Sequence, residues 1–584
     1  MIRKLFRQMM VTQIVSSMTV TLCMLIDSIM IGRFLGVDAM AAYGFAQPVL
    51  LAFAAPGAMI SAGVQVVCGK TMGSGDREGS NACFTVSVAM TLLIAALGLI
   101  LVPLFAGPLS TLLGAGRPGL GNPVHGLTKQ YLLGFILGVP AFLTAQIMVP
   151  YMQMSGSRTR LVAAVLLMTV SDVVFDLLNV LVFHGGTFGM GLASSLSYYV
   201  ALAVGLGCFL RKDCLFRLSR KGLRRDTLRA ILADGFPTVV NQLSLVLLVL
   251  LLNRILRGVG GNIAVAAYSV VSTVSNLCYA FSTGIASVTL MLAAIFTADE
   301  DRSALYTLVK TMRSCAVTVL AAVTALVLLC AGPIVTLFLA DDPDALTLAA
   351  KGLRLFSLCL VPCALNTGFK FYYQGIGRVR LMEGISVLQN FALPALAAAL
   401  LSRFLDTTGV WLAFLCGEAA TLLLICLYVW RANGRVSLAA EDFALLPASF
   451  GAAAENCFEC TVRSVQEAAE ASARAVDFCR AHGQDETGSA LIGLCIEETA
   501  CNIVRHGFSR DGNEHSIDVR LVFRDGARLI RIRDNCVNFD PTHYLELHRR
   551  DDPVAHMGIR MVMSSVKEAR YLNTFGLNNL TLRL

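Results

Sequence analysis

The chain has 584 residues, of which 56% are hydrophobic and only 15% are charged, and its formal net charge is +8. Soluble globular domains are roughly 45–50% apolar and about 25% charged, so this composition excludes an ordinary soluble protein. Most basic residues lie in short loops between apolar runs, where membrane proteins concentrate them, so the positive charge does not indicate a nucleic-acid partner. We expect a large membrane domain joined to a smaller soluble one.

Apolar runs long enough to cross a bilayer recur from the N-terminus to Trp430. A first set lies near 9–31, 42–68, 82–107, 128–152, 160–183 and 190–210. A second set lies near 233–253, 264–296, 310–340, 352–374, 381–402 and 409–430. The sequence therefore predicts an all-α polytopic membrane bundle of about 12 helices over residues 1–432, with lobes at about 1–215 and 230–432.

Basic residues are unevenly divided between the loops on the two sides of this bundle. They are dense from Arg3 to Arg7, from Arg211 to Arg229 and from Arg302 to Arg313, which fall on one side if the spans alternate. The positive-inside rule assigns that side to the cytoplasm. We therefore predict a multi-pass protein of the plasma membrane with both termini in the cytoplasm.

Two pairs of segments resemble each other at an offset of about 220 residues. RFLGVDAMAAY, starting at Arg33, matches RILRGVGGNIAVAAY, starting at Arg254, and QMSGSRTR, starting at Gln153, matches QGIGRVR, starting at Gln374. The pattern predicts an internal repeat of six plus six helices. Duplicated bundles suit alternating access, in which two lobes rock around a central site.

Three acidic residues lie inside the predicted spans. Asp27 is in the first span, and Asp172 and Asp176 are four residues apart in the fifth, which places them on one helix face. A charged side chain at the bilayer centre costs at least about 2.5–3.5 kcal/mol, so each is a functional candidate. Neighbouring carboxylates in low dielectric do not both ionise cheaply, so the group could take up a proton or coordinate sodium. The alternative is a hydrogen bond that supports a broken helix.

Small residues, prolines and one acid recur in order along the first spans and at the start of the seventh: Asp27, Gly32, Gly36, Ala42, Pro48, Gly57, Gly63, Gly73-Ser74-Gly75-Asp76 and Gly235-Phe236-Pro237. With these motifs, residues 5–432 resemble the MATE (multidrug and toxic compound extrusion) transporters, in which such motifs occur in the same order. The resemblance implies secondary antiport, in which small organic, often cationic, compounds leave as H+ or Na+ enters. It also implies that Asp27, Asp172 and Asp176 form an ion site, with Asp172 standing where Asn is usual and Ser195 near a family Thr.

The second lobe lacks the matching acids. Asn390 and Pro394 occupy the repeat-related positions, and Asn241 and Gln242 lie where another branch of the family carries an acidic residue. Ion coupling is therefore expected in the first lobe. Glu418, in the last span, is either functional or hydrogen-bonded inside its lobe.

The composition changes after Trp430, where residues 433–455 are expected to form a linker and 456–584 a small α+β sandwich. The expected elements, in chain order, are a strand at 458–463, helices at 464–482 and 485–506, strands at 516–523 and 528–534, a helix at 558–566, and strands at 569–573 and 579–584. Ser464 and Glu467 form a capping box at the first helix, and Asp525-Gly526 is a strong hairpin signal.

The second of these helices carries Glu498, Asn502 and His506 on one face. ETACNIVRHG, starting at Glu498, resembles the helix motif of the Bergerat-type ATP-binding fold, and more specifically that of the anti-sigma-factor serine kinases. DNCVNFDP, which runs from Asp534 to Pro541 and includes Asp540, and GIRMV, starting at Gly558, resemble the next two boxes. The resemblance implies ATP with Mg2+, with Glu498 as general base, Asn502 on the metal, Asp534 on the adenine, and Asp540 and Gly558 at the nucleotide.

Three positions depart from that pattern. Cys536 and Asn538 replace glycines of the second box, and His556 replaces the first glycine of the third. Those glycines let the backbone approach the nucleotide, and side chains there can obstruct it. A degenerate, sensing or protein-binding domain is therefore the alternative.

The sequence favours a transporter whose cytoplasmic domain regulates it. ATP is not expected to power transport, because the chain has no G-x-x-x-x-G-K-[ST] phosphate loop. One alternative is a membrane-anchored serine kinase or anti-sigma-like regulator that acts on a cytoplasmic regulatory protein and uses the transporter half as a sensor. Another is a flippase for lipid-linked precursors, which would need cationic residues in the central cavity, and the sequence shows few.

Overall fold

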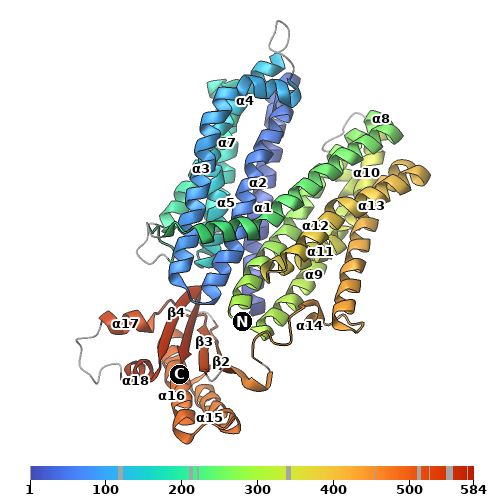
Figure 1. Ribbon diagram of the computed structural model, residues 1–584. Helices are drawn as coiled ribbons and strands as arrows, with labels where there is room; N and C mark the ends of the chain where they lie inside the picture. Colours follow the sequence, from blue (N-terminus) through green and yellow to red (C-terminus); the bar gives the residue numbers. More distant parts are fainter. Residues whose placement is uncertain are drawn as a thin grey trace.

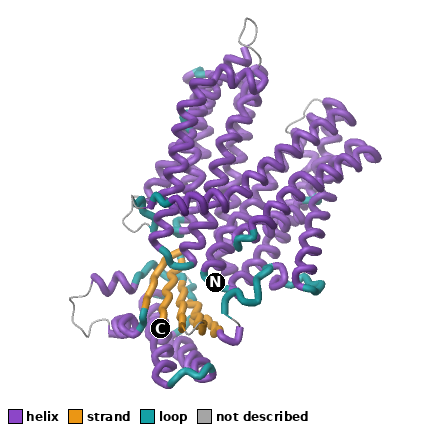
Figure 2. Tube along the Cα trace, viewed as in Figure 1, coloured by secondary structure: helices purple, strands orange, loops and turns teal. Residues whose placement is uncertain are grey.

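The computed structural model describes residues 2–115, 123–209, 215–219, 222–336, 343–452, 454–509, 514–524, 527–547, 557–574 and 576–584. Long helices make up the first three-quarters of the chain, and a small domain with a β-sheet lies at one end of them (Figures 1 and 2). The N-terminus lies at the same end, which we call the domain end (Figure 1).

The first bundle is built from α1 to α7. Their bounds are Ile2–Met30, Val37–Gly73, Arg77–Ser110, Pro123–Ile136, Val139–Met154, Arg158–Leu178 and Gly186–Phe209. The second bundle is built from α8 to α13, with bounds Arg225–Ala298, Arg302–Thr336, Pro343–Ser357, Leu360–Gly375, Val379–Val387 and Leu393–Asn433. Short π-helical segments extend several of these helices at Ile31–Leu35, Thr111–Ala115, Asn179–Phe183 and Leu388–Ala392. Helices satisfy their own backbone groups, which a bilayer requires.

Within the described residues, nine helical stretches are long and apolar enough to cross a membrane, or up to 11 if each bent pair is one span. The bent pairs are α4 with α5, at 50°, and α10 with α11, at 48°. A single apolar stretch, Val379–Asn433, contains both of the last two predicted spans, and Asp406 between them has a non-helical backbone. The predicted number of 12 spans and the six-plus-six repeat therefore stay predictions.

The two bundles lie close together at the domain end and spread apart toward the opposite end (Figure 1). The largest contact between them is made by α2 and α8, and α1 also packs on α8. Both ends of α8 pack on α2, because Gly63 lies against Ile231 and Gly73 against Ile295. α8 therefore folds back on itself between these contacts. Lys70 also forms an ion pair with Asp234 at 3.0 Å across the same contact, which we call the seam.

The C-terminal domain is a five-stranded antiparallel sheet with the strand order β1-β2-β3-β5-β4. The strands are Cys457–Val462, Ile517–Arg524, Ala527–Asp534, Glu568–Thr574 and Leu577–Arg583. Its helices are α15 to α18, at Val465–Ala481, Glu486–Gly507, Pro541–Leu547 and Met557–Ser565, and the linker holds the short helix α14, Ala440–Phe443, and a 3-10 turn at Ala454–Asn456. α15, α16 and α18 bury a common apolar core against one face of the sheet.

The predicted α+β domain is confirmed in its elements, with boundaries displaced by at most two residues. The capping box is present, since Ser464 Oγ accepts a hydrogen bond from the Glu467 amide at 3.1 Å and the Glu467 carboxylate accepts one from the Arg463 amide at 2.7 Å. The predicted Asp525-Gly526 turn lies outside the described residues. α17 was not predicted, and Asp540 forms its N-cap by accepting hydrogen bonds from Thr542 and His543.

Gly63→Ala should weaken the seam, because a Cβ at this position would lie 2.2 Å from the carbonyl oxygen of Ile231. Overpacking of this kind costs about 1–3 kcal/mol, so we expect a lower temperature of thermal unfolding in detergent. Gly107→Ala in α3 is the matched control, since a Cβ there would meet nothing within 4 Å. An unfolding temperature for Gly63→Ala equal to that of Gly107→Ala would contradict the close packing.

Candidate functional sites

A cluster of three buried carboxyl groups lies between α1 and α6. Asp27, on α1, is 7% exposed, and Asp172 and Asp176, on α6, are 2% and 0% exposed. Asp27 interacts electrostatically with both residues of α6. Ser194 Oγ, on α7, donates a hydrogen bond to Asp27 Oδ2 at 3.2 Å. Three helices of the first bundle therefore bring the three predicted acids together.

Most of the oxygens in this cluster lack a partner. Within the described parts of the chain, Asp27 Oδ1, Asp172 Oδ1 and both carboxylate oxygens of Asp176 accept no hydrogen bond. An ionised carboxylate buried without a partner is very costly, and such a group normally becomes neutral or acquires a counter-charge. The arrangement can therefore accept protons or a cation.

Ser195, which was predicted to join this cluster, lies elsewhere. Its hydroxyl is within hydrogen-bond distance of the carbonyl oxygens of Gly134, Phe135 and Gly191, at 2.9, 3.1 and 2.8 Å. It packs at the bend between α4 and α5, where a Cβ on Gly138 would lie 2.5 Å from the Ser195 Cα. The neighbouring Ser194 is the serine that contacts Asp27, and no local signal in the sequence distinguishes it from Ser195.

The second bundle holds a different polar group, centred on Lys370 of α11. Lys370 is 2% exposed, and its Nζ donates hydrogen bonds to Asn241 Oδ1 at 2.6 Å and to Gln389 Oε1 at 2.9 Å. Asn390 Nδ2 also donates to Asn241 Oδ1, at 2.6 Å. The buried ammonium is therefore held by amide oxygens from α8 and from the π-helical segment before α13.

Glu418 of α13 belongs to the same network. Gln389 Nε2 donates to both of its carboxylate oxygens, at 3.2 and 3.1 Å, and Asn366 Nδ2 donates to Oε2 at 2.7 Å. Glu418 is thus hydrogen-bonded inside its lobe, and Lys370 supplies a nearby opposite charge. Lys370 was missed in the sequence, although a lone lysine inside the predicted span 352–374 was the signal that could have revealed it.

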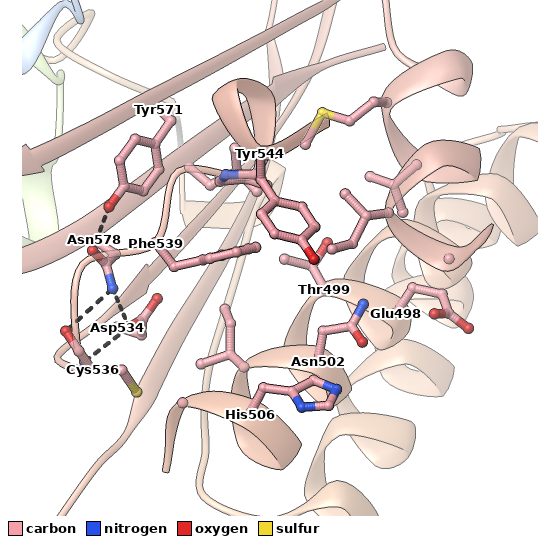
Figure 3. Close-up of a pocket in the computed structure, with 18 of the residues that line it drawn as sticks. Glu498, Thr499, Asn502, His506, Asp534, Cys536, Phe539, Tyr544, Tyr571 and Asn578 are labelled. Atoms are coloured by element: carbon pink, nitrogen blue, oxygen red, sulfur yellow. Dashed lines mark hydrogen bonds between the residues drawn. The ribbon is translucent and has the colours of Figure 1, made fainter. Parts of the chain in front are cut away.

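A third group of residues lines a pocket of about 410 Å3 in the C-terminal domain. Glu498, Asn502 and His506 line it from one face of α16, as their spacing predicts (Figure 3). Asp534, at the end of β3, lines the opposite wall, and Phe539 and Tyr544 lie between, with ring centroids 5.2 Å apart. The volume and the mainly apolar lining with a few polar groups suit a small organic ligand.

The Asp534 carboxyl group is held in a fixed orientation. Its Oδ1 accepts hydrogen bonds from the Cys536 amide at 2.9 Å and from Asn578 Nδ2 at 2.8 Å. Burial raises the pKa of Asp534, although these two hydrogen bonds act in the opposite direction. A fixed buried carboxyl group of this kind can recognise an amino group on a ligand.

The other predicted nucleotide residues divide between the pocket and its surroundings. Gly558 packs against Glu498, since a Cβ on Gly558 would lie 2.2 Å from Glu498 Oε2. Asp540 caps α17 instead of lining the pocket. Cys536 lines the pocket, whereas the Asn538 side chain contacts the Tyr571 hydroxyl. His556 lies outside the described residues.

Comparison with known proteins identifies the membrane half. The sequence model of the MatE family matches residues 13–178 and 237–397, which is more than half of the chain. The chain belongs to the MatE family. A probable multidrug resistance protein NorM from Listeria monocytogenes is 26% identical to this MatE protein over 185 residues. That match covers 29% of the chain and 39% of the relative, so the chain spans less than half of the length of this curated relative.

Solved structures share the fold of this MatE protein. An outward-facing multidrug resistance MATE family transporter of the MOP superfamily superposes with a TM-score of 0.68 at 20% identity, over 72% of this chain and 94% of that one. A mutant of the Vibrio cholerae MATE transporter VcmN gives 0.67 at 17% identity, over 72% and 95%. This MatE protein is therefore a multi-pass membrane protein with the fold of these transporters.

Lys370→Met should destabilise this MatE protein, because it removes the opposite charge near Glu418 and one donor each from Asn241 and Gln389. Breaking a buried pair on one side costs about 3–5 kcal/mol, which thermal unfolding in detergent would detect. The double variant Lys370→Met with Glu418→Gln should recover most of that loss, because it removes both charges. Equal stabilities of the single variant and the unchanged protein would contradict the network.

Proposed function

We propose that this protein is a secondary antiporter of the plasma membrane that exports small organic, often cationic, compounds in exchange for H+ or Na+. The observation that carries the proposal is the cluster of Asp27, Asp172 and Asp176, which are buried in the first lobe with unpaired carboxylate oxygens. We further propose that the domain end faces the cytoplasm, as the distribution of basic residues predicts.

The cluster lends itself to coupling because its charge decides how well α1 packs on α6. When the three carboxyl groups are fully ionised, they repel one another, and most of their oxygens lack a hydrogen-bond donor. Uptake of a proton, or of a sodium ion held by the carboxylate oxygens, removes that repulsion and lets the helices approach. An ion that binds one arrangement of the helices better than another shifts the equilibrium between them by that difference in affinity.

The C-terminal domain is, in this proposal, an ATP-binding-type regulatory domain. Asp534 would accept a hydrogen bond from the adenine amino group. The Asn502 side-chain oxygen would face Mg2+, which prefers oxygen ligands and is usually held largely by the phosphates of the nucleotide. The fixed Asp534 carboxyl group and the pocket of about 410 Å3 fit such a ligand. Glu498 lines the same pocket, and this placement favours the second candidate function, a serine kinase that uses Glu498 as general base on a cytoplasmic regulatory protein.

Asp176→Asn should abolish most ion-driven efflux, because an amide neither binds a proton reversibly nor neutralises a cation. Coupling between two sites usually changes the affinity at one of them by a factor of about 5 to 150. We therefore expect at least a tenfold loss of efflux from proteoliposomes driven by an ion gradient. Applying the H+ and Na+ gradients separately identifies the coupling ion. Asp38→Asn, at an exposed position on α2, is the control. Full efflux by Asp176→Asn would refute the assignment of the ion site.

Asn502→Ala and Asp534→Asn should each weaken the binding of Mg-ATP to the full-length protein at least tenfold. The first change removes an oxygen that would face the metal. The second keeps one carbonyl oxygen for the Cys536 and Asn578 donors and replaces the other carboxylate oxygen, which would accept from the adenine amino group, with an NH2 donor. Isothermal titration of the purified protein in detergent measures both, with Asn456→Ala, which does not line the pocket, as the control. Absence of binding at millimolar ATP in the folded unchanged protein would exclude a nucleotide site.

A further inference from the structure

The two faces of the C-terminal sheet carry different chemistry. Side chains alternate along β3, so Arg531 and Arg533 point to one face, while Ile532 and Asp534 point to the other. The face with Asp534 holds the pocket and the core under α16. On the opposite face Arg520, on β2, lies directly across from Arg531. Like charges directly across a sheet repel each other, so this arginine face requires acidic partners.

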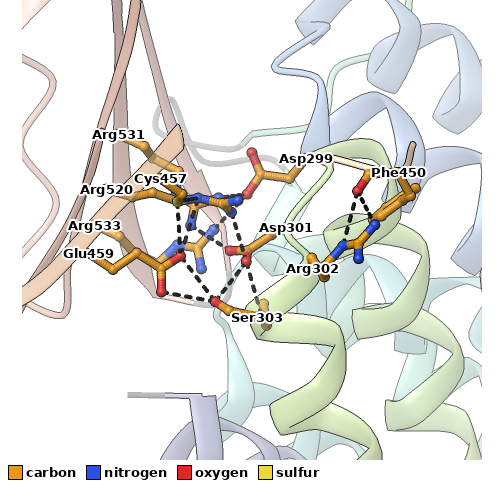
Figure 4. Close-up of polar contacts among 11 residues, drawn as sticks. Asp299, Asp301, Arg302, Ser303, Phe450, Cys457, Glu459, Arg520, Arg531 and Arg533 are labelled. Atoms are coloured by element: carbon orange, nitrogen blue, oxygen red, sulfur yellow. Dashed lines mark hydrogen bonds and ion pairs between the residues drawn. The ribbon is translucent and has the colours of Figure 1, made fainter. Parts of the chain in front are cut away.

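Those partners lie at the end of α8, in the second lobe. Arg520 Nη1 lies 2.7 Å from Asp301 Oδ1, and Arg531 Nη2 lies 2.5 Å from Asp301 Oδ2 (Figure 4). Asp299 pairs with Arg531 and, at 3.2 Å, with Arg533. The side chains of Arg520 and Asp301 are only 8% and 3% exposed, so this ion pair is almost completely shielded from solvent. Burial alone would raise the pKa of Asp301, but the guanidinium groups of Arg531, Arg520 and Arg533 hold it well below its usual value.

The linker before the domain is fixed to the same loop. Arg302, the first residue of α9, donates a hydrogen bond to the carbonyl oxygen of Phe450 at 2.8 Å (Figure 4). It also donates to the carbonyl oxygens of Pro447 and Ala448, at 2.7 and 2.9 Å. Ser303 Oγ lies 3.1 Å from both carboxylate oxygens of Glu459, on β1. The domain therefore binds the second lobe through the sheet and the linker together.

The domain also reaches the first lobe. Arg570 Nη1, on β4, donates a hydrogen bond to the carbonyl oxygen of Ser74 at 3.0 Å. Ser74 directly follows α2 and Asp299 directly follows α8. The two helix ends touch, because a Cβ on Gly73 would lie 2.3 Å from the Ile295 carbonyl oxygen. One domain is thus bonded to both lobes where the seam reaches the domain end.

We propose that the arginine face is a clamp whose partner is the acidic loop Asp299–Asp301 of the same chain, and that its docking holds the two lobes together at the domain end. Alternating access requires that end to open, so an undocked domain permits opening and a docked one resists it. Arg533 and Asp534 are adjacent on β3, and their side chains point to opposite faces of the sheet. A ligand that shifts Asp534 in the pocket therefore also shifts Arg533 in the clamp. This last step rests on the proposed regulatory role of the pocket.

The test is hydrogen exchange, read by mass spectrometry, on the full-length protein in detergent without substrate or nucleotide. Arg531→Glu should place three acids together, undock the domain and accelerate amide exchange about tenfold in residues 59–73 and 285–298, a typical size for coupling between sites. Arg528→Glu makes the same charge change on the same strand but on the opposite face of the sheet, and it should leave exchange at the seam unchanged. Asp299→Arg combined with Arg531→Glu should recover part of the protection.

Two results would overturn the clamp. One is faster exchange in the 299–303 loop, which reports undocking, with no change at the seam. The other is equal acceleration by Arg528→Glu and Arg531→Glu. Slow exchange in α15 and α16 of the Arg531→Glu variant shows that the domain stays folded. The variant Asp299→Asn weakens the same contact from the membrane half and leaves the sheet unchanged. The experiment contains neither substrate nor ATP, so its result for the clamp does not depend on whether the pocket binds ATP. Adding Mg-ATP to the unchanged protein then tests whether the pocket acts on the seam.

Discussion

The structure depends on one constraint, which is that a bilayer offers no partner to an ionised or polar group. The membrane half answers it in two ways. In the second lobe Glu418 is surrounded by donors, and Lys370 compensates its charge. In the first lobe Asp172 and Asp176 are left with unpaired oxygens. Only the arrangement in the first lobe gains from an ion that arrives from outside. The first lobe is therefore the one suited to ion coupling.

The same constraint does not hold at the domain end, where water and a folded domain are available. The seam relies mainly on close backbone approach at Gly63 and Gly73, with one ion pair between Lys70 and Asp234. The charged contacts between the C-terminal domain and the second lobe stand outside the membrane spans, at Asp299 and Asp301. In the proposed regulation, the domain would change the balance between closed and open lobes at a modest energetic cost, because two conformations of one protein commonly differ by only a few kcal/mol.

The parts predictable from the sequence were those with a local signal. The helices of the membrane half followed from apolar runs, and the C-terminal elements followed from alternation and from the Ser464 capping box. The spacing of Asp172 and Asp176 placed them on one face of α6. Contacts between distant segments had no such signal. Ser195 and Ser194 are neighbours in sequence, and which one faces Asp27 depends on how α7 packs against α1 and against the bend between α4 and α5. The pairing of Arg531 with Asp299 joins residues 232 positions apart.

The placement of the C-terminal sheet bears on why the two halves share one chain. β3 carries pocket-lining Asp534 on one face and the arginine cluster on the other. A ligand in the pocket would therefore lie only one strand away from the contact with the membrane half. A separate protein would have to find the Asp299–Asp301 loop by diffusion, whereas a short linker keeps the two at an effective concentration of about millimolar. At that concentration a weak contact is enough for docking. A weak contact is also one that a ligand with modest differential affinity can reverse, which is what regulation of a transporter by a small molecule requires.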